Sequence, residues 1–239
     1  MTEGRPRPRI AVVTFPGSND DRDARLALTG LGADAVPVWH ADSSLPDVAA
    51  VVLPGGFSYG DYLRAGALAR FAPIMEAVQA FAAEGGLVLG ICNGFQVLCE
   101  AGLLPGILRP NQSLSFVCRD VRLAVERVDT AFTSRCSHGQ RLTIPVKHGE
   151  GSFFADDELL AELEAKRQIV LRYERDNPNG SVADIAAVMN ESGTVMGLMP
   201  HPEHAVDRLI GSGSTDGMFV LGSLIDAVHE RMRRGAAFV

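Results

Sequence analysis

The stretch that decides the fold is GLVLGICNGFQVLCEAG, Gly86 to Gly102. It opens with an apolar run of strand length, Leu87–Ile91, and passes within two residues into a helical pattern over Gly94–Ala101. Cys92 stands between the two, with one glycine two residues before it and another two residues after it. The stretch therefore predicts a strand, a sharp turn and a helix, with a cysteine at the tip of the turn.

The rest of the N-terminal half repeats this alternation of short apolar runs and amphipathic stretches. The expected strands are Ile10–Phe15, Ala35–Trp39 and Val48–Leu53, and the expected helices are Asp21–Leu31 and Ala67–Ala83, the second interrupted by Pro73. Alternation of this kind predicts βαβ units, a buried parallel sheet and helices on both of its faces.

The C-terminal half has a different character. Its strand-like runs are closely spaced: Val117–Val125, Arg141–Val146, Ile169–Tyr173, Ala183–Met189 and Thr194–Met199, with an amphipathic helix expected over Gly217–Arg233. Close spacing favours antiparallel strands added to the same sheet. We therefore expect an α/β fold with three layers, in which a mostly parallel, flavodoxin-like sheet carries added antiparallel strands. Residues 1–9 are expected to be a flexible tail and residues 10–239 a single domain.

Composition excludes several classes of partner. The chain has 239 residues, of which 46% are hydrophobic and 21% charged, with a formal net charge of −7. A negative balance disfavours nucleic acid and anionic membrane surfaces as partners. We expect no signal peptide and no apolar run of the ~18 residues that span a bilayer. The 4 cysteines form no CxxC pair, which favours free thiols in a reducing cytoplasm.

Cys92 has the surroundings of a nucleophile. Ligands of parallel α/β sheets bind at the carboxyl ends of the strands, where Cys92 falls. Flanking glycines relieve crowding in a strained turn, and a helix start favours the thiolate form of cysteine. The alternative is a buried structural cysteine, but strand, glycines and helix together favour the nucleophile. No such pattern surrounds the remaining cysteines, which are Cys99, Cys118 and Cys136.

His201 is the best candidate for the base that a nucleophilic thiol requires. It directly follows an expected strand in MPHPEH, and Glu203 two residues later could hold its tautomer. A rival interpretation is a metal site of His201, Glu203 and His204. Outside a helix, these residues lack the fixed spacing of HExxH zinc sites, so we expect no metal.

A third strand end supplies candidate oxyanion donors. The strand Val48–Leu53 runs into PGGFSYGD, where Gly55 and Gly56 let the backbone approach a ligand closely. N–H groups of this loop, with that of Asn93, could form an oxyanion hole. The alternative is an ordinary glycine turn, but the position of the loop at a strand end favours the functional interpretation.

The order Cys…His-x-Glu resembles that of the class I, triad-type glutamine amidotransferases, whereas α/β-hydrolases place the acid before the histidine. Further stretches are similar to one branch of that family, the glutaminase subunits of phosphoribosylformylglycinamidine synthase. These stretches are FPGSN (Phe15–Asn19), PGGFSYGDYLRAGALARF (Pro54–Phe71), GICNGFQVLCEAGLLPG (Gly90–Gly106), HGEG (His148–Gly151), NPNGS (Asn177–Ser181) and MPHPEHAVD (Met199–Asp207). The likeness covers almost the whole chain from Ile10 to the last helix.

The resemblance implies a substrate and partners. Glutamine would be hydrolysed to glutamate and ammonia, and the ammonia would pass to a large ATP-dependent synthetase subunit of purine synthesis, with a small bridging subunit as third component. No cofactor is implied for this chain, and ATP and Mg²⁺ belong to the synthetase partner. The absence of GxxxxGK[ST] agrees with this expectation.

The resemblance also implies roles for individual residues. Backbone N–H groups of Gly56, Phe57 and Asn93 would hold the oxyanion, and His148 and Gly149 would hold the α-amino and carboxylate groups of glutamine. Gln96, one helical turn beyond Cys92, either lines the glutamine pocket or faces solvent. Candidates for a loop facing the synthetase are Phe57, Tyr59, Tyr62 and Arg64.

Two residues depart from the family pattern, and their roles stay open. Asp20 stands where the family often has cysteine, and His204 stands where it often has arginine.

Two other functions remain as alternatives. One is a peptidase or glyoxalase of the DJ-1 group, but such enzymes usually have a histidine beside the nucleophile, where this chain has Asn93. The other is a thiol redox sensor, for which no resolving cysteine is evident in the sequence.

Overall fold

A nine-stranded mixed sheet, ordered β2-β1-β3-β4-β11-β10-β9-β6-β7, forms the centre of the computed structural model, which describes residues 6–235. Its parallel part consists of β2 (Asp34–Trp39), β1 (Arg9–Thr14), β3 (Ala50–Leu53), β4 (Leu87–Ile91) and β11 (Val195–Leu198). Every residue of β3, β4 and β11 is buried. This explains why these strands are uninterrupted apolar runs in the sequence, since helices cover both faces of a parallel sheet.

The remaining strands continue the same sheet in antiparallel pairs. They are β10 (Ile185–Met189), β9 (Ile169–Tyr173), β6 (Val117–Val125) and β7 (Arg141–His148). Buried residues alternate with more exposed ones along β7, as expected of a strand that has one face toward solvent. A small separate sheet pairs β5 (Ile107–Arg109) with β8 (Ser152–Phe154).

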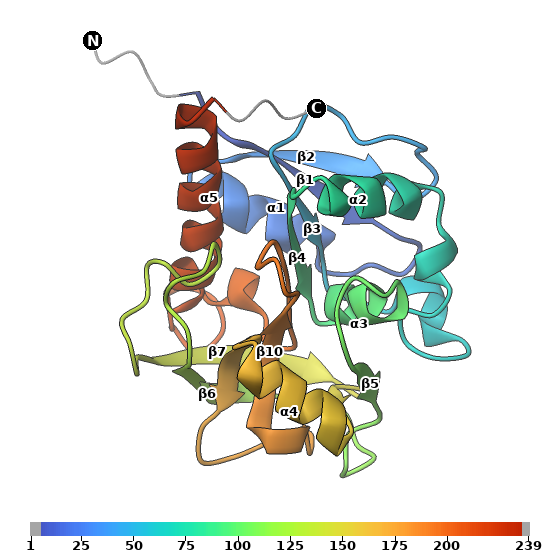
Figure 1. Cartoon of the computed structure of the whole chain (residues 1–239), viewed down its shortest axis with the longest axis vertical. Coiled ribbons are helices and arrows are strands. Elements are labelled where there is room, and N and C mark those ends of the chain that lie inside the picture. The colour runs from blue at the N-terminus through green and yellow to red at the C-terminus, as the bar shows by residue number, and fades with distance from the viewer. Residues whose placement is uncertain (1–5, 236–239) are drawn as a thin grey trace.

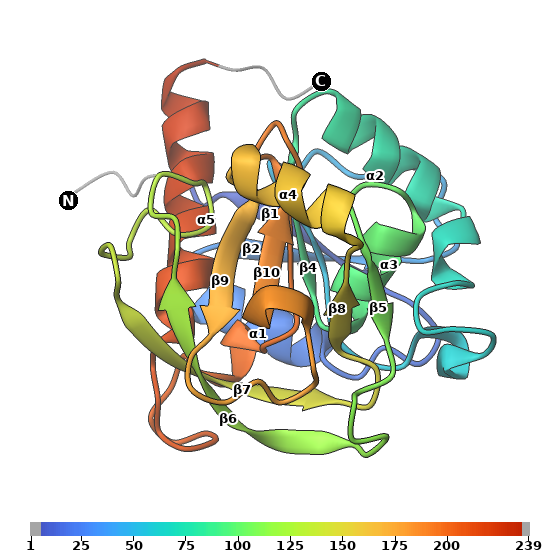
Figure 2. The ribbon, with the colours of Figure 1, turned by 60° about the horizontal axis from the view of Figure 1, so that its bottom comes forward.

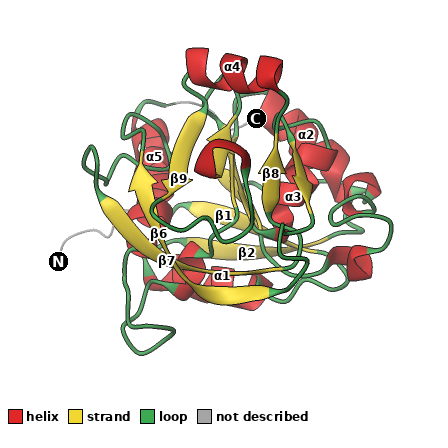
Figure 3. Cartoon of the chain, turned by 90° about the horizontal axis from the view of Figure 1, so that it is seen from below, coloured by secondary structure: helices red, strands yellow, loops and turns green. Residues whose placement is uncertain are grey.

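Helices lie outside the strands on both faces of the parallel sheet (Figure 1; Figure 3). One side carries α1 (Asp21–Gly30) and α5 (Gly217–Arg233), and the other carries α2 (Ile74–Ala83) and α3 (Asn93–Glu100). In Figure 2, α4 (Asp157–Ala165) lies beside the antiparallel strands, and Glu164 of α4 pairs with Arg172 of β9. Short 3₁₀ turns are η1 (Ser58–Asp61), η2 (Ala69–Phe71), η3 (Val182–Asp184) and η4 (Pro202–His204).

The predicted fold class is confirmed: the sheet has a parallel half with helices on both faces and an antiparallel extension in the C-terminal half of the chain. The long helix expected over Ala67–Ala83 is instead divided into η2 and α2. Pro73 is the reason, because proline lacks an N–H group and is tolerated only at a helix start. The sequence analysis missed β5, β8 and α4. Of the tail expected over residues 1–9, residues 1–5 lie outside the described residues and Arg9 already belongs to β1.

Helix α4 provides a test of local stability. Asp156 caps it by accepting a hydrogen bond from the Leu159 N–H at 2.8 Å. We expect Asp156→Ala to lower the free energy of unfolding by about 1 kcal/mol, as measured by urea denaturation. Asp157→Ala, one residue into the helix, is the control and should cost less. Equal losses in the two variants would contradict the capping role.

Candidate active site

Cys92 occupies a strained turn between β4 and α3. Its backbone is left-handed, with φ +50° and ψ −105°, a conformation that non-glycine residues rarely adopt. A Cβ on Gly94 would lie 1.9 Å from the Leu53 carbonyl oxygen, and one on Gly90 would lie 2.7 Å from the Gly94 backbone. Both glycines are therefore required for the chain to turn here, as their spacing in the sequence predicts.

Cys92 and His201, the predicted nucleophile and base, lie at the same end of two neighbouring strands. Strands β4 and β11 are parallel neighbours, so Cys92 and His201 leave the sheet at the same end. The His201 Nδ1 lies 2.6 Å from the Glu203 Oε1, and both residues are buried. Pro202 begins the short turn η4 between them, and this turn directs the carboxylate back onto the ring.

Electrostatics favour a protonated His201. Burial lowers the pKa of His201, but the charges of Glu203 and Cys92 outweigh it and raise this pKa to about 10. A protonated ring donates its Nδ1 proton to Glu203. Its Nε2 forms no hydrogen bond of standard geometry within the described residues, although the Cys92 sulfur is near enough to raise the pKa. The Nε2–H is thus available to the sulfur or to a bound substrate.

The glycine loop after β3, which contains Gly55 and Gly56, packs directly against the His201 ring. Gly56 has φ +139°, and a Cβ there would lie 2.5 Å from the Asn19 backbone nitrogen. A Cβ on Gly55 would lie 2.6 Å from the His201 ring carbon Cε1. Only glycine allows the loop to approach the histidine so closely. The N–H groups of Gly56 and Asn93 form no hydrogen bond within residues 6–235.

The oxyanion role expected for Phe57 requires a correction. Its N–H donates to the Gly17 carbonyl oxygen at 2.9 Å, because the Ser18–Gly56 bridge joins this loop to the loop after β1. A donor that is already paired is not available to an oxyanion. Gly56 and Asn93 remain as the candidate donors.

Side chains of α3 hold the loops around the site. The Asn93 Oδ1 accepts from the Ser58 N–H at 3.2 Å, and its Nδ2 donates to the Gln96 Oε1 at 2.9 Å. Gln96 in turn donates to the Glu150 carbonyl oxygen. Gln96 is buried, so the solvent-facing alternative is excluded.

His148 and Gly149 belong to a buried amide network. The His148 Nδ1 lies 3.0 Å from the Asn111 Oδ1, and its Nε2 lies 3.4 Å from the Asn179 Nδ2. The Gly149 carbonyl oxygen accepts from the Asn111 N–H at 2.9 Å. Burial and the charge of His201 lower the pKa of His148 to about 4, so its ring is neutral at pH 7. The network fixes the turn that follows β7.

Similarity to known proteins agrees with this geometry. A family model described as "CobB/CobQ-like glutamine amidotransferase domain" matches residues 7–218. The phosphoribosylformylglycinamidine synthase subunit PurQ of Frankia casuarinae is 58% identical over 225 residues, covering 94% of this chain and 96% of its own. The protein of the same name from Rubrobacter xylanophilus is 58% identical over 217 residues, covering 91% and 97%. This chain belongs to the PurQ family of glutamine amidotransferases.

A solved structure supports the assignment. It is titled "Structure of PurLQS from Thermotoga maritima", and one of its chains matches with a TM-score of 0.85 at 46% identity, covering 92% of this chain and 98% of that chain. Within residues 6–235, no helix has the length and apolar character needed to cross a membrane.

The sequence analysis did not predict that three polar residues, Asp20, Lys147 and His204, meet beside His201. Asp20 is 2% exposed, and its carboxylate contacts the Lys147 ammonium and lies 3.2 Å from the His204 Nε2. The signals in the sequence were that Asp20 and His204 both depart from the family pattern and that His204 lies next to Glu203 in the rival metal interpretation. Lys147 carried no signal, because its place depends on the pairing of β7.

The side chains at and around His201 include the three residues of the rival metal interpretation. Ligand atoms of Asp20, His201, Glu203 and His204 all lie within 4.8 Å of one another. The Lys147 ammonium, however, already pairs with the Asp20 carboxylate, so a metal ion would compete with it for this ligand. The absence of a bound metal stays a prediction.

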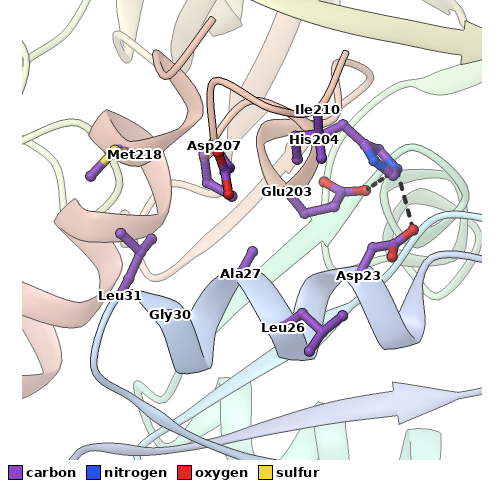
Figure 4. Close-up of a pocket in the computed structure, with 11 residues that line it drawn as sticks. Asp23, Leu26, Ala27, Gly30, Leu31, Glu203, His204, Asp207, Ile210 and Met218 are labelled. Atoms are coloured by element: carbon purple, nitrogen blue, oxygen red, sulfur yellow. Dashed lines mark ion pairs between the residues drawn. The ribbon is translucent and has the colours of Figure 1, made fainter. Parts of the chain in front are cut away.

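A cavity of about 480 Å³ has Glu203 and His204 among the residues of its wall (Figure 4). Helix α1, the turn η4 with the segment after it, and the start of α5 line the cavity. Its polar side chains are Asp23, Glu203, His204 and Asp207. Cys92 is not among its lining residues. The cavity therefore reaches Glu203 and His204 without including Cys92 in its wall.

The strained turn at Cys92, which we call the elbow, can be tested by adding one methyl group at Gly94. Gly94→Ala places a Cβ against backbone that cannot move aside, so we expect a loss of at least about 2 kcal/mol in the free energy of unfolding. Gly30→Ala is the control, because its Cβ would have nothing within 4 Å. A Gly94→Ala protein as stable as the wild type would refute the packing argument.

The charge on Glu203 can be tested through His201. Because this charge raises the pKa of His201, Glu203→Gln should lower that pKa from about 10, and the ring should lose its proton at lower pH. NMR titration of the imidazole signals measures the shift directly. Glu191→Gln, at an exposed glutamate that pairs with Lys166, should leave the titration unchanged. A pKa that is the same in Glu203→Gln and wild type would exclude the proposed coupling.

Proposed function

We propose that this chain is a glutaminase whose triad is Cys92, His201 and Glu203, and that it delivers ammonia to the ATP-dependent synthetase subunit of phosphoribosylformylglycinamidine synthase. The observation that carries the proposal is the strained Cys92 elbow beside a buried His201–Glu203 pair, within a chain of the PurQ family. An elbow cysteine with this partner geometry suits acyl transfer from an amide.

The first half of the reaction forms a thioester. The Cys92 thiolate attacks the side-chain carboxamide carbon of glutamine, and the N–H groups of Gly56 and Asn93 stabilise the oxyanion that develops. The C–N bond then breaks, and the leaving nitrogen takes the Nε2 proton of His201. Ammonia and a γ-glutamyl thioester on Cys92 result.

The second half returns the enzyme to its starting state. His201 accepts a proton from water, the resulting hydroxide attacks the thioester carbon, and the Cys92 thiolate leaves. Glu203 holds the ring and stabilises its protonated form through the 2.6 Å contact. The sum of both halves is glutamine plus water giving glutamate plus ammonia.

Buried polar groups beside Cys92 could bind the polar groups of a small amino acid. Gln96 and Asn93 are buried beside the elbow, and the loop after β7 contacts Gln96 through the Glu150 carbonyl oxygen. In our proposal, His148 acts by holding this loop, because its ring nitrogens face Asn111 and Asn179. Gly149 lies in the same loop and presents backbone to the substrate.

Exposed apolar side chains near the glycine loop suit a partner protein. Phe57 is 44% exposed and Tyr62 74% exposed, and the Phe57 ring lies 6.3 Å from that of Phe116. Such residues are enriched at protein interfaces. Of the other two candidates, Tyr59 bonds His40 at 2.7 Å and Arg64 pairs with Glu100 at 2.6 Å. Phe57 and Tyr62 are therefore the residues that we assign to the synthetase-facing surface.

The remaining components complete the proposal. ATP and Mg²⁺ act on the synthetase subunit, a small third subunit bridges the complex, and this chain carries no cofactor of its own. The cytoplasm is the proposed compartment. The free thiols of all 4 cysteines support this assignment, since disulfides are rare in reducing compartments.

The decisive experiment separates glutamine use from ammonia use. In the complex reconstituted with the synthetase partner, we expect Cys92→Ala to lower glutamine-dependent product formation by roughly 10³-fold or more, while ammonia-dependent formation stays at the wild-type rate. Cys118→Ala, at an exposed cysteine, is the matched control and should leave both rates unchanged. Loss of both rates in an assembled Cys92→Ala complex would contradict the proposed role.

A further inference from the structure

We propose that Asp20 is a second carboxylate for the catalytic imidazole, a positioning residue that acts on His201 together with Glu203 and is held in place by Lys147 and His204. The inference rests on the proposed function, because it assigns Asp20 to the same glutaminase site.

Two carboxylates face the same ring nitrogen. The His201 Nδ1 lies 2.6 Å from the Glu203 Oε1 and 3.7 Å from the Asp20 Oδ2. All three side chains are almost completely buried. Charges at these separations interact strongly when water is excluded. Asp20 therefore favours the imidazolium form of His201, as Glu203 does.

Asp20 is an anion in the folded protein. Burial raises its pKa, but hydrogen bonds from His204 and Lys147 and the charges of His201 and Lys147 outweigh burial and hold the pKa well below its usual range. An ionised carboxylate at 2% exposure requires such partners. Asp20 thus brings a full negative charge to the rear of the catalytic ring.

Lys147 links Asp20 to the nucleophile. Its ammonium contacts the Asp20 carboxylate, and its backbone carbonyl oxygen lies 3.7 Å from the Cys92 sulfur. Because one residue of β7 makes both contacts, the position of Asp20 is tied to that of the thiol.

His204 closes the network on the side of the cavity. Its Nε2 lies 3.2 Å from the Asp20 Oδ1, 3.7 Å from the Glu203 Oε1 and 3.8 Å from the Asp23 Oδ2. The titratable groups around His201 and Asp20 are thereby Glu203, Lys147 and His204, together with Cys92 and His148, whose charges are coupled to that of His201. Asp23 lies only on the outer side of His204. The two departures from the family pattern, Asp20 and His204, are in direct contact.

The glycine loop fixes Asp20 in this place. Its N–H donates to the Gly55 carbonyl oxygen at 3.2 Å. A Cβ on Gly55 would lie 2.5 Å from the Asp20 Oδ2 and 2.6 Å from the His201 Cε1. Loop, carboxylate and ring are therefore in mutual contact, and a change at Asp20 acts on the imidazole.

A measurable consequence follows for Glu203. When Glu203 loses its charge, Asp20 is still an anion near Nδ1, so part of the stabilisation of the imidazolium survives. Either carboxylate compensates in part for loss of the other, and removing both should cost more than the product of the two single effects.

The test compares Asp20→Asn, Glu203→Gln and the double variant in the reconstituted complex. We expect Asp20→Asn to lower the kcat of glutamine hydrolysis roughly tenfold with little change in KM, and to move the alkaline limb of the pH profile to lower pH. The kcat of the double variant should be lower than the value obtained by multiplying the two single-variant effects. Asp23→Asn, the same chemical change on the outer side of His204, should leave kcat and the limb unchanged.

A second measurement distinguishes the proposed effect from a folding defect. The His201 pKa, measured by NMR in the isolated chain, should fall in Asp20→Asn and also in Asp20→Ser. An unchanged pH limb and an unchanged His201 pKa in folded Asp20 variants would overturn the inference, as would strictly multiplicative kcat effects. Failure of the proposed function is distinguishable, because the wild-type complex would then release no glutamate from glutamine while still using ammonia.

Discussion

The site depends on one hydrogen bond at the end of the parallel sheet. The Cys92 N–H donates to the Leu198 carbonyl oxygen at 2.8 Å; Leu198 is the last paired residue of β11, and Cys92 directly follows β4. This bond fixes the strained turn against the strand that leads to His201. Cys92 and His201, the proposed nucleophile and base, are thus positioned by sheet geometry, which favours a preorganised site.

A cost accompanies this arrangement, because the site holds several charges away from water. Asp20, Glu203 and the His201 imidazolium are buried, and Lys147 reaches Asp20 from β7. Removing one member of such a group leaves an unpaired buried charge, which costs about 3–5 kcal/mol in known cases. The cluster is therefore a balance of charges in which no member acts alone. This is why the chemistry of His201 is described by both carboxylates and their partners.

Local signals made much of the site predictable. The glycine spacing around Cys92 and the HPEH segment after β11 each record a local backbone requirement, and both elements formed where they were expected. The strands β4, β6 and β9 and the helix α5 also have the predicted bounds.

Features that depend on tertiary contacts were not predictable. The Phe57 N–H is paired because two loops after different strands meet, and Asp20 meets Lys147 across 127 positions in the sequence. The strands β5 and β8 are only 3 residues each, too short for a periodic pattern to appear. Gln96 could have faced either way on α3, and only packing against the loop after β7 decided its direction.

The cavity between α1 and α5 reaches one residue of the proposed triad, Glu203. A small molecule filling it would contact Glu203 and His204, whereas Cys92 is not among its lining residues. Such a molecule would lie beside the carboxylate that contacts the His201 ring, so a charge on it would act on the pKa of that imidazole. Its apolar wall, built from Leu26, Ile210 and Met218, and its acidic groups together define a pharmacophore for a cationic amphiphile.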